Sequence, residues 1–161
     1  MRQARQTKGG WKYQLNTREG DCLLSLLREF PVTMIGHAKI SKTDADPKSV
    51  EREKLLNESL AEHRKELKKH ALNLLAAGRF KRGEKGYLLT LSLEEREILL
   101  QILNDIRVGC WHTVGEPEKL EAEPPPEAHE ELFLYNLMHL AGYFEVAILN
   151  DVHGGHQPGQ G

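Results

Sequence analysis

The strongest pattern in the chain lies at residues 86–113, where a short apolar run is followed by an apolar stripe of helical period. Residues 87–91 (YLLTL) follow a glycine and predict a short strand. Ser92 stands three residues before Glu95, the spacing of a capping box, in which each side chain bonds the backbone amide of the other residue. Beyond it, apolar side chains recur every three or four residues, at Leu99, Ile102, Leu103, Ile106 and Cys110. The pattern predicts a helix over residues 93–113.

The N-terminal half carries a similar pattern. Residues 11–15 (WKYQL) alternate as a half-buried strand does, and Asn16 or Thr17 precedes Glu19 at a second capping-box spacing. The helix expected next ends at Pro31 and has an apolar face made of Cys22, Leu23, Leu26, Leu27 and Phe30. Residues 10–27 align without gaps on residues 86–103. We interpret this match as an internal repeat, although any strand, cap and helix in succession resembles another.

Two longer helical patterns complete the two halves. Residues 48–77 carry one apolar face, made of Leu56, Leu60, Leu67, Ala71, Leu74 and Leu75. A helix of this length spans about 45 Å, so one end is expected to project from a small domain or to pair with another chain. The last pattern, from residue 127 or 128 to about Asp151, is apolar nearly all round, which predicts a central helix buried by several neighbours.

These elements predict a mostly α fold of the α+β type, in a single domain over residues 1–161. It has four main helices and a small two-stranded β-ribbon. The ribbon pairs residues 11–15 with residues 87–91, with antiparallel pairing favoured, because a lone strand leaves its backbone groups without partners.

The expected half-repeats are residues 11–78 and 86–151, each strand, helix, helix, related by a pseudo-two-fold axis. Residues 1–10 and 153–161 are expected to be flexible tails. The remaining segments are predicted as connections or loops: 31–47, 78–86 and 116–127, the last containing three consecutive prolines.

Composition indicates a class of protein but no chemistry. The chain has 161 residues, 29% of them charged and 39% hydrophobic, as in ordinary helix-rich soluble proteins. No apolar run approaches the roughly 20 residues of a membrane helix, and the polar residues 1–10 show no secretory signal. Cys22 and Cys110 lie far apart in helical apolar contexts, so we interpret them as buried hydrophobes rather than a disulfide. We therefore expect a cytoplasmic protein with no membrane contact.

The formal charge of −2 conceals an asymmetry between the halves. Residues 1–85 carry a net charge of +8 and residues 86–161 a net charge of −10. Such a division is consistent with charge matching inside the fold, with head-to-tail self-association, or with a basic surface for an acidic partner.

Candidate chemistry is confined to a few polar residues of the helical framework. One hypothesis brings Asp105, Arg107 and His139 together in a pocket between helices 93–113 and 128–151, in a small-ligand binder or an enzyme. His139 would be the general base and Asp105 would orient it. The opposing interpretation makes Asp105 and Arg107 partners of ion pairs or helix caps, and His139 a structural histidine. The second interpretation is favoured, because the sequence contains no catalytic signature.

No metal or cofactor is expected, since there is no HExxH motif, no clustered Cys/His spacing, and no phosphate-binding glycine motif in residues 78–86. A basic segment, residues 64–85, suits a weak nucleic-acid binder that tracks phosphates, or else a partner surface or a solvated face. Its cations are Arg64, Lys65, Lys68, Lys69, Arg79, Lys81, Arg82 and Lys85.

The helix start at Leu91–Glu95, the Asn104–Asp105–Arg107 segment and Tyr135 of the closing helix resemble a known pattern. It is that of an uncharacterised bacterial family, a domain of unknown function best known from actinobacterial proteins encoded beside the ClpS protease adaptor. The first half is similar more loosely, through residues 11–27. The resemblance implies the fold and a cytoplasmic setting, points to proteolysis or its regulation, and carries over no catalytic residue.

Together these features predict a non-enzymatic protein-interaction or regulatory module. The expected partner is a second copy, as in a homodimer, or another protein, bound through the helix over residues 48–77.

Overall fold

In the part of the chain that the structure describes, a β-hairpin is followed by two helices, and this succession then occurs a second time. The computed structural model describes residues 1–31, 46–114 and 129–150, with the backbone alone for residues 2–5. The strands are β1 (Arg2–Thr7), β2 (Gly10–Leu15), β3 (Phe80–Gly83) and β4 (Gly86–Leu91). The helices are α1 (Thr17–Glu29), α2 (Pro47–Ala76), α3 (Leu93–Thr113) and α4 (His129–Leu149). The predicted loop at 116–127, the tail at 153–161 and nearly all of the connection at 31–47 lie outside the described residues.

The helix starts follow the sequence signals. In the first capping box, the Asn16 side chain accepts from the Glu19 amide at 2.9 Å, and the Glu19 carboxylate accepts from the Asn16 amide at 2.8 Å. Ser92 and Glu95 exchange the same two bonds at 3.1 and 2.8 Å. The start of α2 is capped by the side chain of Asp46, with a proline in the first turn. Both predicted capping boxes are confirmed.

The sheet has four antiparallel strands in the order β1–β2–β4–β3. The predicted pairing of β2 with β4 is confirmed, with Trp11 opposite Leu91 and Leu15 opposite Tyr87. The prediction of a two-stranded ribbon is wrong, because β1 and β3 extend it at both edges. Residues 2–7 are therefore a strand rather than part of a flexible tail, and residues 80–83 are a strand within the predicted loop. A two-stranded ribbon leaves both outer edges unpaired, and each hairpin supplies the missing partner.

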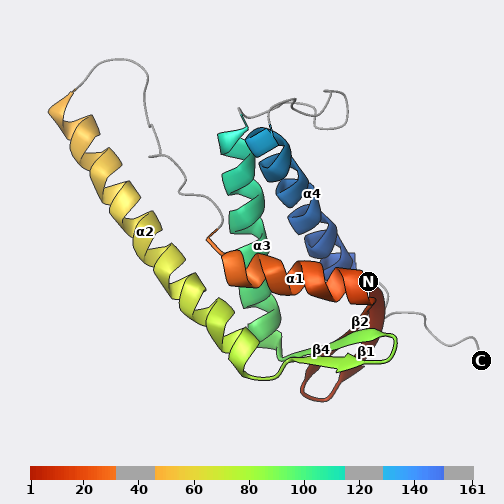
Figure 1. The fold of residues 1–161 in the computed structure, drawn as a ribbon. Helices are drawn as coiled ribbons and strands as arrows, with labels where there is room; N and C mark the ends of the chain where they lie inside the picture. The colour runs from red at the N-terminus through yellow and green to blue at the C-terminus, as the bar shows by residue number, and fades with distance from the viewer. Residues whose placement is uncertain (32–45, 115–128, 151–161) are drawn as a thin grey trace, which may run out of the picture.

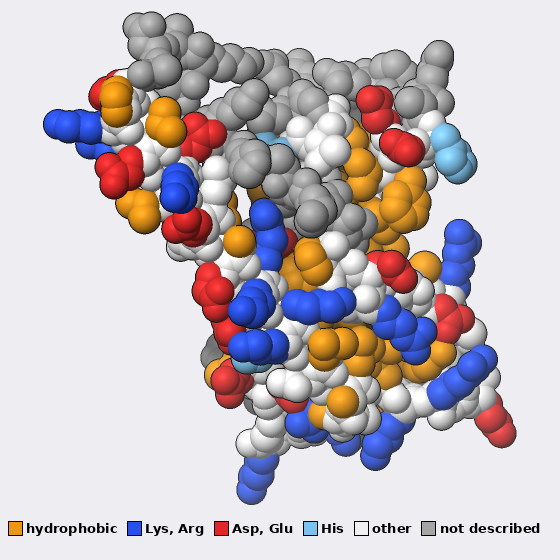
Figure 2. All heavy atoms as spheres, turned by 60° about the vertical axis from the view of Figure 1, so that its left-hand side comes forward, with side chains coloured by type: hydrophobic (Ala, Val, Ile, Leu, Met, Phe, Trp, Pro, Cys, Tyr) orange, Lys and Arg blue, Asp and Glu red, His pale blue; other side chains and the backbone are white. Residues whose placement is uncertain are grey.

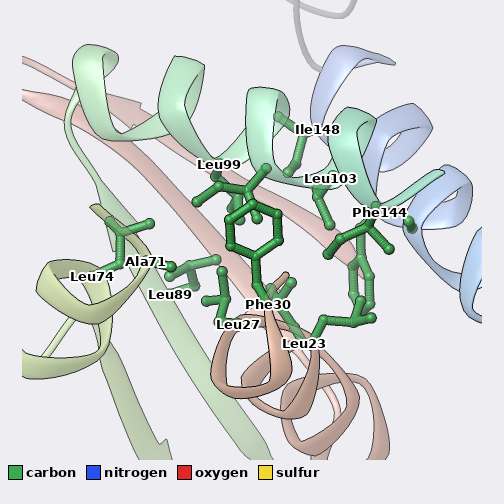
Figure 3. Packing of buried hydrophobic residues seen from close by; sticks show 14 of the residues in the cluster. Leu23, Leu27, Phe30, Ala71, Leu74, Leu89, Leu99, Leu103, Phe144 and Ile148 are labelled. Atoms are coloured by element: carbon green, nitrogen blue, oxygen red, sulfur yellow. The ribbon is translucent and has the colours of Figure 1, made fainter. Parts of the chain in front are cut away.

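The helices lie on one side of the sheet, which forms the base of the molecule in Figure 1. The strands bury alternate residues toward them, among which Tyr13, Leu15 and Leu89 have no solvent exposure. Figure 3 shows the side chain of Phe30, the residue after α1, extending toward Leu99 of α3 within this core. The result is a mostly helical α+β fold, four helices on a four-stranded sheet.

The packing of α2 agrees with expectation, and that of α4 differs from it. In α2, the buried residues Leu67, Ala71 and Leu74 all belong to the C-terminal half, and the other end diverges from the remaining helices (Figure 1). The expectation that one end of this helix projects is confirmed. The expectation of a central α4 is wrong: the helix packs mainly on α3 and leaves apolar side chains exposed, namely Phe133, Tyr143, Val146 and Leu149.

Candidate functional site

The three residues of the catalytic hypothesis have separate partners. Asp105 of α3 accepts a hydrogen bond from Arg64 of α2 at 3.3 Å. Arg107 of α3 pairs with Glu145 of α4 at 2.7 Å, on the opposite side of the helix from α2. His139 is exposed and its ring lies edge-on to Tyr135.

The geometry therefore gives Asp105 and Arg107 the ion-pair roles of the opposing interpretation. Each ties α3 to a neighbouring helix. None of the three hypothetical catalytic residues lines either of the two most prominent cavities of the described residues. Burial raises the pKa of the Glu145 carboxyl, and the Arg107 guanidinium beside it offsets only part of that effect.

The eight cations of the basic segment divide into two groups. Four of them are engaged within the fold. Arg64 pairs with Asp105, and Arg79 pairs with Glu95 at 2.7 Å. Lys68 donates to the Arg28 carbonyl at 3.0 Å, and Lys69 pairs with Glu66 at 2.6 Å. The others are exposed: Lys65 on α2, and Lys81, Arg82 and Lys85 on the β3–β4 hairpin. The eight side chains therefore do not form a continuous row of exposed cations along one helix that could follow a phosphate backbone.

The larger cavity is a groove between α1 and α4, with a volume of about 850 Å³. Its apolar lining comes from Cys22 and Leu26 on α1, Pro31, and a helical stripe on α4 made of Phe133, Leu137 and Leu140. Polar side chains of α1 form the rest of the lining: Thr17, Arg18, Asp21, Ser25 and Glu29. The volume lies within the range of pockets that bind small molecules.

A smaller hollow of about 380 Å³ lies between α2 and α3. It brings together His63 and His70 with the carboxylates of Glu66, Glu94 and Glu97. Among residues 1–31, 46–114 and 129–150, no three His, Cys, Asp or Glu side chains are arranged to hold a metal ion. The hollow therefore carries no metal assignment.

Arg96 is the residue that sequence reasoning missed. This residue is only 4% exposed, although it is a cation within α3. Its Nε donates to the Tyr13 hydroxyl of β2 at 3.1 Å, and its Nη2 donates to the Ile148 carbonyl of α4 at 2.9 Å. The guanidinium carbon lies 5.0 Å from the centre of the Trp11 ring. One buried arginine thus joins the sheet to the last turn of the C-terminal helix.

A second polar connection joins α1 to α4 directly. The Tyr143 hydroxyl donates to the Glu19 carboxylate at 2.6 Å, and the Met1 amino group also contacts Glu19. The hydrogen bond to Glu19 raises the pKa of Tyr143. Burial acts to raise the pKa of Glu19, but the hydrogen bonds from the Met1 amine, Tyr143 and the Asn16 backbone hold it below its usual value.

The two cysteines differ in accessibility, and both thiols are free. Cys110 is fully buried in α3, and burial raises its pKa to about 11. Cys22 is half-buried and lines the groove. The thiolate is the reactive form, so Cys22 is the accessible nucleophile of the pair.

By length and composition alone, α4 is apolar enough to cross a membrane, with a mean hydropathy of 1.4 over 18 residues. That test by itself is weak, because helices of soluble proteins also pass it. The helix carries the Glu145–Arg107 ion pair and receives the Arg96 bond at Ile148. The expectation of no membrane contact stays a prediction.

Comparisons of the chain with protein-family models, with curated proteins and with solved structures give no match.

Proposed function

We propose that the protein is a non-enzymatic interaction module that binds another protein chain through the projecting half of α2, residues 47–60. The observation that supports this most is the absence of any buried residue in this half, whereas the other half packs into the core. Val50 and Leu55 are 57% and 60% exposed, and Leu56 is 40% exposed.

The projecting half of α2 has little tertiary packing to stabilise its helical conformation. Most helical stability in proteins comes from packing of an apolar face rather than from intrinsic propensity. Residues 47–60 contain exposed leucines next to charges of both signs, Lys48 and Arg52 against Glu51 and Glu53. A partner that covers the leucines would stabilise the projecting half of α2 and remove apolar surface from water. The partner is a second copy or a different protein.

The experiment compares two exposed leucines of the same helix. Leu55→Glu places a charge on the projecting half, and Leu72→Glu places the same charge on an exposed position, 51% accessible, of the packed half. Light scattering over a wide concentration range, with a pull-down, measures association. We expect association that Leu55→Glu abolishes and Leu72→Glu preserves. A monomer at every concentration with an empty pull-down, or equal behaviour of the two variants, contradicts the proposal.

A small-ligand binder is the second candidate, and the groove between α1 and α4 is the observation that favours it. The groove lies between α1 and α4, whereas the sequence-based hypothesis placed a pocket between the helices that carry Asp105 and His139. A fluorescent apolar probe such as anilinonaphthalene sulfonate, added to the native protein, should slow modification of Cys22. Unchanged Cys22 reactivity at saturating probe would exclude the groove.

The cytoplasmic setting and the connection to proteolysis rest on composition and on the family resemblance alone. They form part of the proposal as predictions. Fractionation of cells that express the tagged chain tests the first. Pull-down with the protease adaptor tests the second, and retention of no adaptor would remove it.

We infer further that the two halves are copies of one hairpin–helix–helix unit related by a pseudo-two-fold axis. The strand register supports this, because Tyr13 lies opposite Leu89, its equivalent in the gapless alignment. The glycines also correspond: a Cβ at Gly10 would lie 2.1 Å from the Leu91 carbonyl oxygen, and one at Gly86 would lie 2.2 Å from that of Leu15. Both have positive φ angles, +156° and +124°.

If Gly10 and Gly86 are equivalent, substitution of either one should destabilise the fold by a similar amount. We expect Gly10→Ala and Gly86→Ala each to lower the free energy of unfolding by about 1–3 kcal/mol, because the added methyl overlaps a carbonyl. Gly83→Ala is the control, since its nearest neighbour is 4.0 Å away. Strong destabilisation by only one of the two substitutions would contradict the equivalence.

A further inference from the structure

The two hairpins concentrate positive charge on the sheet. Residues 1–15 and 79–91 contain eight lysines and arginines and a single acidic residue, Glu84. Their net charge is +7, so the remainder of the chain carries −9 within a total of −2. The segments are 64 residues or more apart in sequence, and the β2–β4 pairing brings them together. Lysine and arginine side chains predominate at the base of the molecule in Figure 2.

The four helices of the described residues all lie on one side of this sheet, so none of them covers its other face. Lys12, Gln14, Leu88 and Thr90 alternate with the buried strand residues and are half-buried or exposed, and Lys81 beside them is exposed. Lys12 pairs with Thr90 and Lys81 pairs with Leu88, so the two lysines stand on the same face, on either side of β4. Strand spacing and residue rise place their backbones on the order of 10 Å apart, enough to meet separate phosphates.

We propose that this open face of the sheet binds the phosphate backbone of nucleic acid without reading its sequence. The face is lysine-rich and polar, with only Leu88 as an apolar residue among the five named above. Protein interfaces are depleted of lysine and have an apolar core, whereas nucleic-acid interfaces are strongly positive and polar. Charge complementarity therefore favours a polyphosphate over an acidic protein.

The aromatic residues explain why sequence reading is not expected. Trp11, Tyr13, Phe80 and Tyr87 lie at register positions opposite residues that are buried against the helices. The open face thus offers no aromatic platform on which bases stack among the described strand residues. This surface is separate from the projecting half of α2 and differs from a track along residues 64–85, because Arg64, Lys68, Lys69 and Arg79 have partners within the fold.

The experiment measures fluorescence anisotropy of a labelled mixed-sequence DNA duplex over a range of salt concentration. The double variant Lys12→Gln/Lys81→Gln removes two charges from the open face. The control Lys48→Gln/Lys54→Gln removes two exposed charges from the projecting half of α2. We expect binding at low salt, with the slope of log affinity against log salt reduced by about 1.8 in the sheet variant, or 0.9 for each phosphate contact, and unchanged in the control.

Circular dichroism verifies that both variants fold. Equal weakening by the two variants would show a diffuse charge effect and overturn the proposal, as would no binding at low salt. Labelled polyglutamate of matched charge that binds as tightly as the duplex would assign the face to an acidic protein instead, which also overturns it.

Discussion

Replacement of Arg96 by alanine tests the packing of the whole fold at one position. Arg96 makes two charge-assisted hydrogen bonds to neutral groups, the Tyr13 hydroxyl and the Ile148 carbonyl, and stacks on Trp11. Such bonds contribute about 1.5–3 kcal/mol each, and a cation–π contact about 1 kcal/mol. The pair with Glu97 adds little, because that carboxylate is exposed.

The buried guanidinium also carries a desolvation penalty, which truncation removes. The net expectation for Arg96→Ala is a loss of about 2–4 kcal/mol in the free energy of unfolding, because the Tyr13 hydroxyl and the Ile148 carbonyl each lose the hydrogen bond that Arg96 donates. Arg96→Lys should recover less than half, because one ammonium cannot reproduce the planar fork. Urea unfolding followed by circular dichroism measures both, with the exposed Arg52→Ala as control.

A local measurement separates this role from general destabilisation. Hydrogen exchange in the last turn of α4, around Ile148, should accelerate in Arg96→Ala more than exchange in α1. A loss below about 1 kcal/mol, within the range of ordinary surface substitutions such as Arg52→Ala, would refute the reasoning.

Two further predictions concern titratable groups. Native protein should present one reactive thiol, Cys22, to a disulfide reagent near neutral pH, and unfolded protein two, because Cys110 is buried with a pKa of about 11; two equally fast thiols in the native state would contradict this. Burial raises the pKa of Glu145 in the folded chain, so folding favours the neutral carboxyl. The resulting stabilisation is fully present below the pKa of the unfolded chain, and it is lost as pH rises through the pKa of the folded chain. Between these two pKa values, the free energy of unfolding of Glu145→Gln, measured with denaturant, should therefore fall less steeply with rising pH than that of the parent chain. Identical slopes would contradict the raised pKa of Glu145.

The sequence predicted the elements that carry strong local signals. The capping boxes at Asn16 and Ser92 form because each needs only residues three apart, which the sequence displays directly. The β2–β4 pairing followed from the requirement that a strand have a partner. This pairing could be predicted because the apolar pattern indicates only two strands, residues 11–15 and 87–91, so each has one candidate partner.

The edge strands β1 and β3 escaped detection for a physical reason. Their sequences, RQARQT and FKRG, contain almost no apolar alternation. Edge strands bury little and are often charged, which discourages pairing with other chains. Hydrophobic periodicity therefore misses strands whose stability comes from backbone pairing with a buried neighbour.

The errors at α4 and Arg96 share an origin. An apolar circumference suggested burial on all sides of α4, but within residues 1–31, 46–114 and 129–150 this helix packs mainly on one other helix, α3. Arg96 lies between two glutamates and reads as a surface charge. A signal was present, since it stands three residues before Leu99 and seven before Leu103, on the buried face of α3. The partners that satisfy it, on β2 and α4, are invisible to local pattern.

The projecting half of α2 as a protein interface is the central claim, and hydrogen–deuterium exchange tests it most directly. The amides of residues 47–60 should exchange rapidly in dilute protein and become protected at high chain concentration or with a captured partner. Those around Leu67 and Ala71, already packed in the core, should stay protected throughout. Protection that never develops in residues 47–60, while the chain associates through another surface or not at all, would contradict the account.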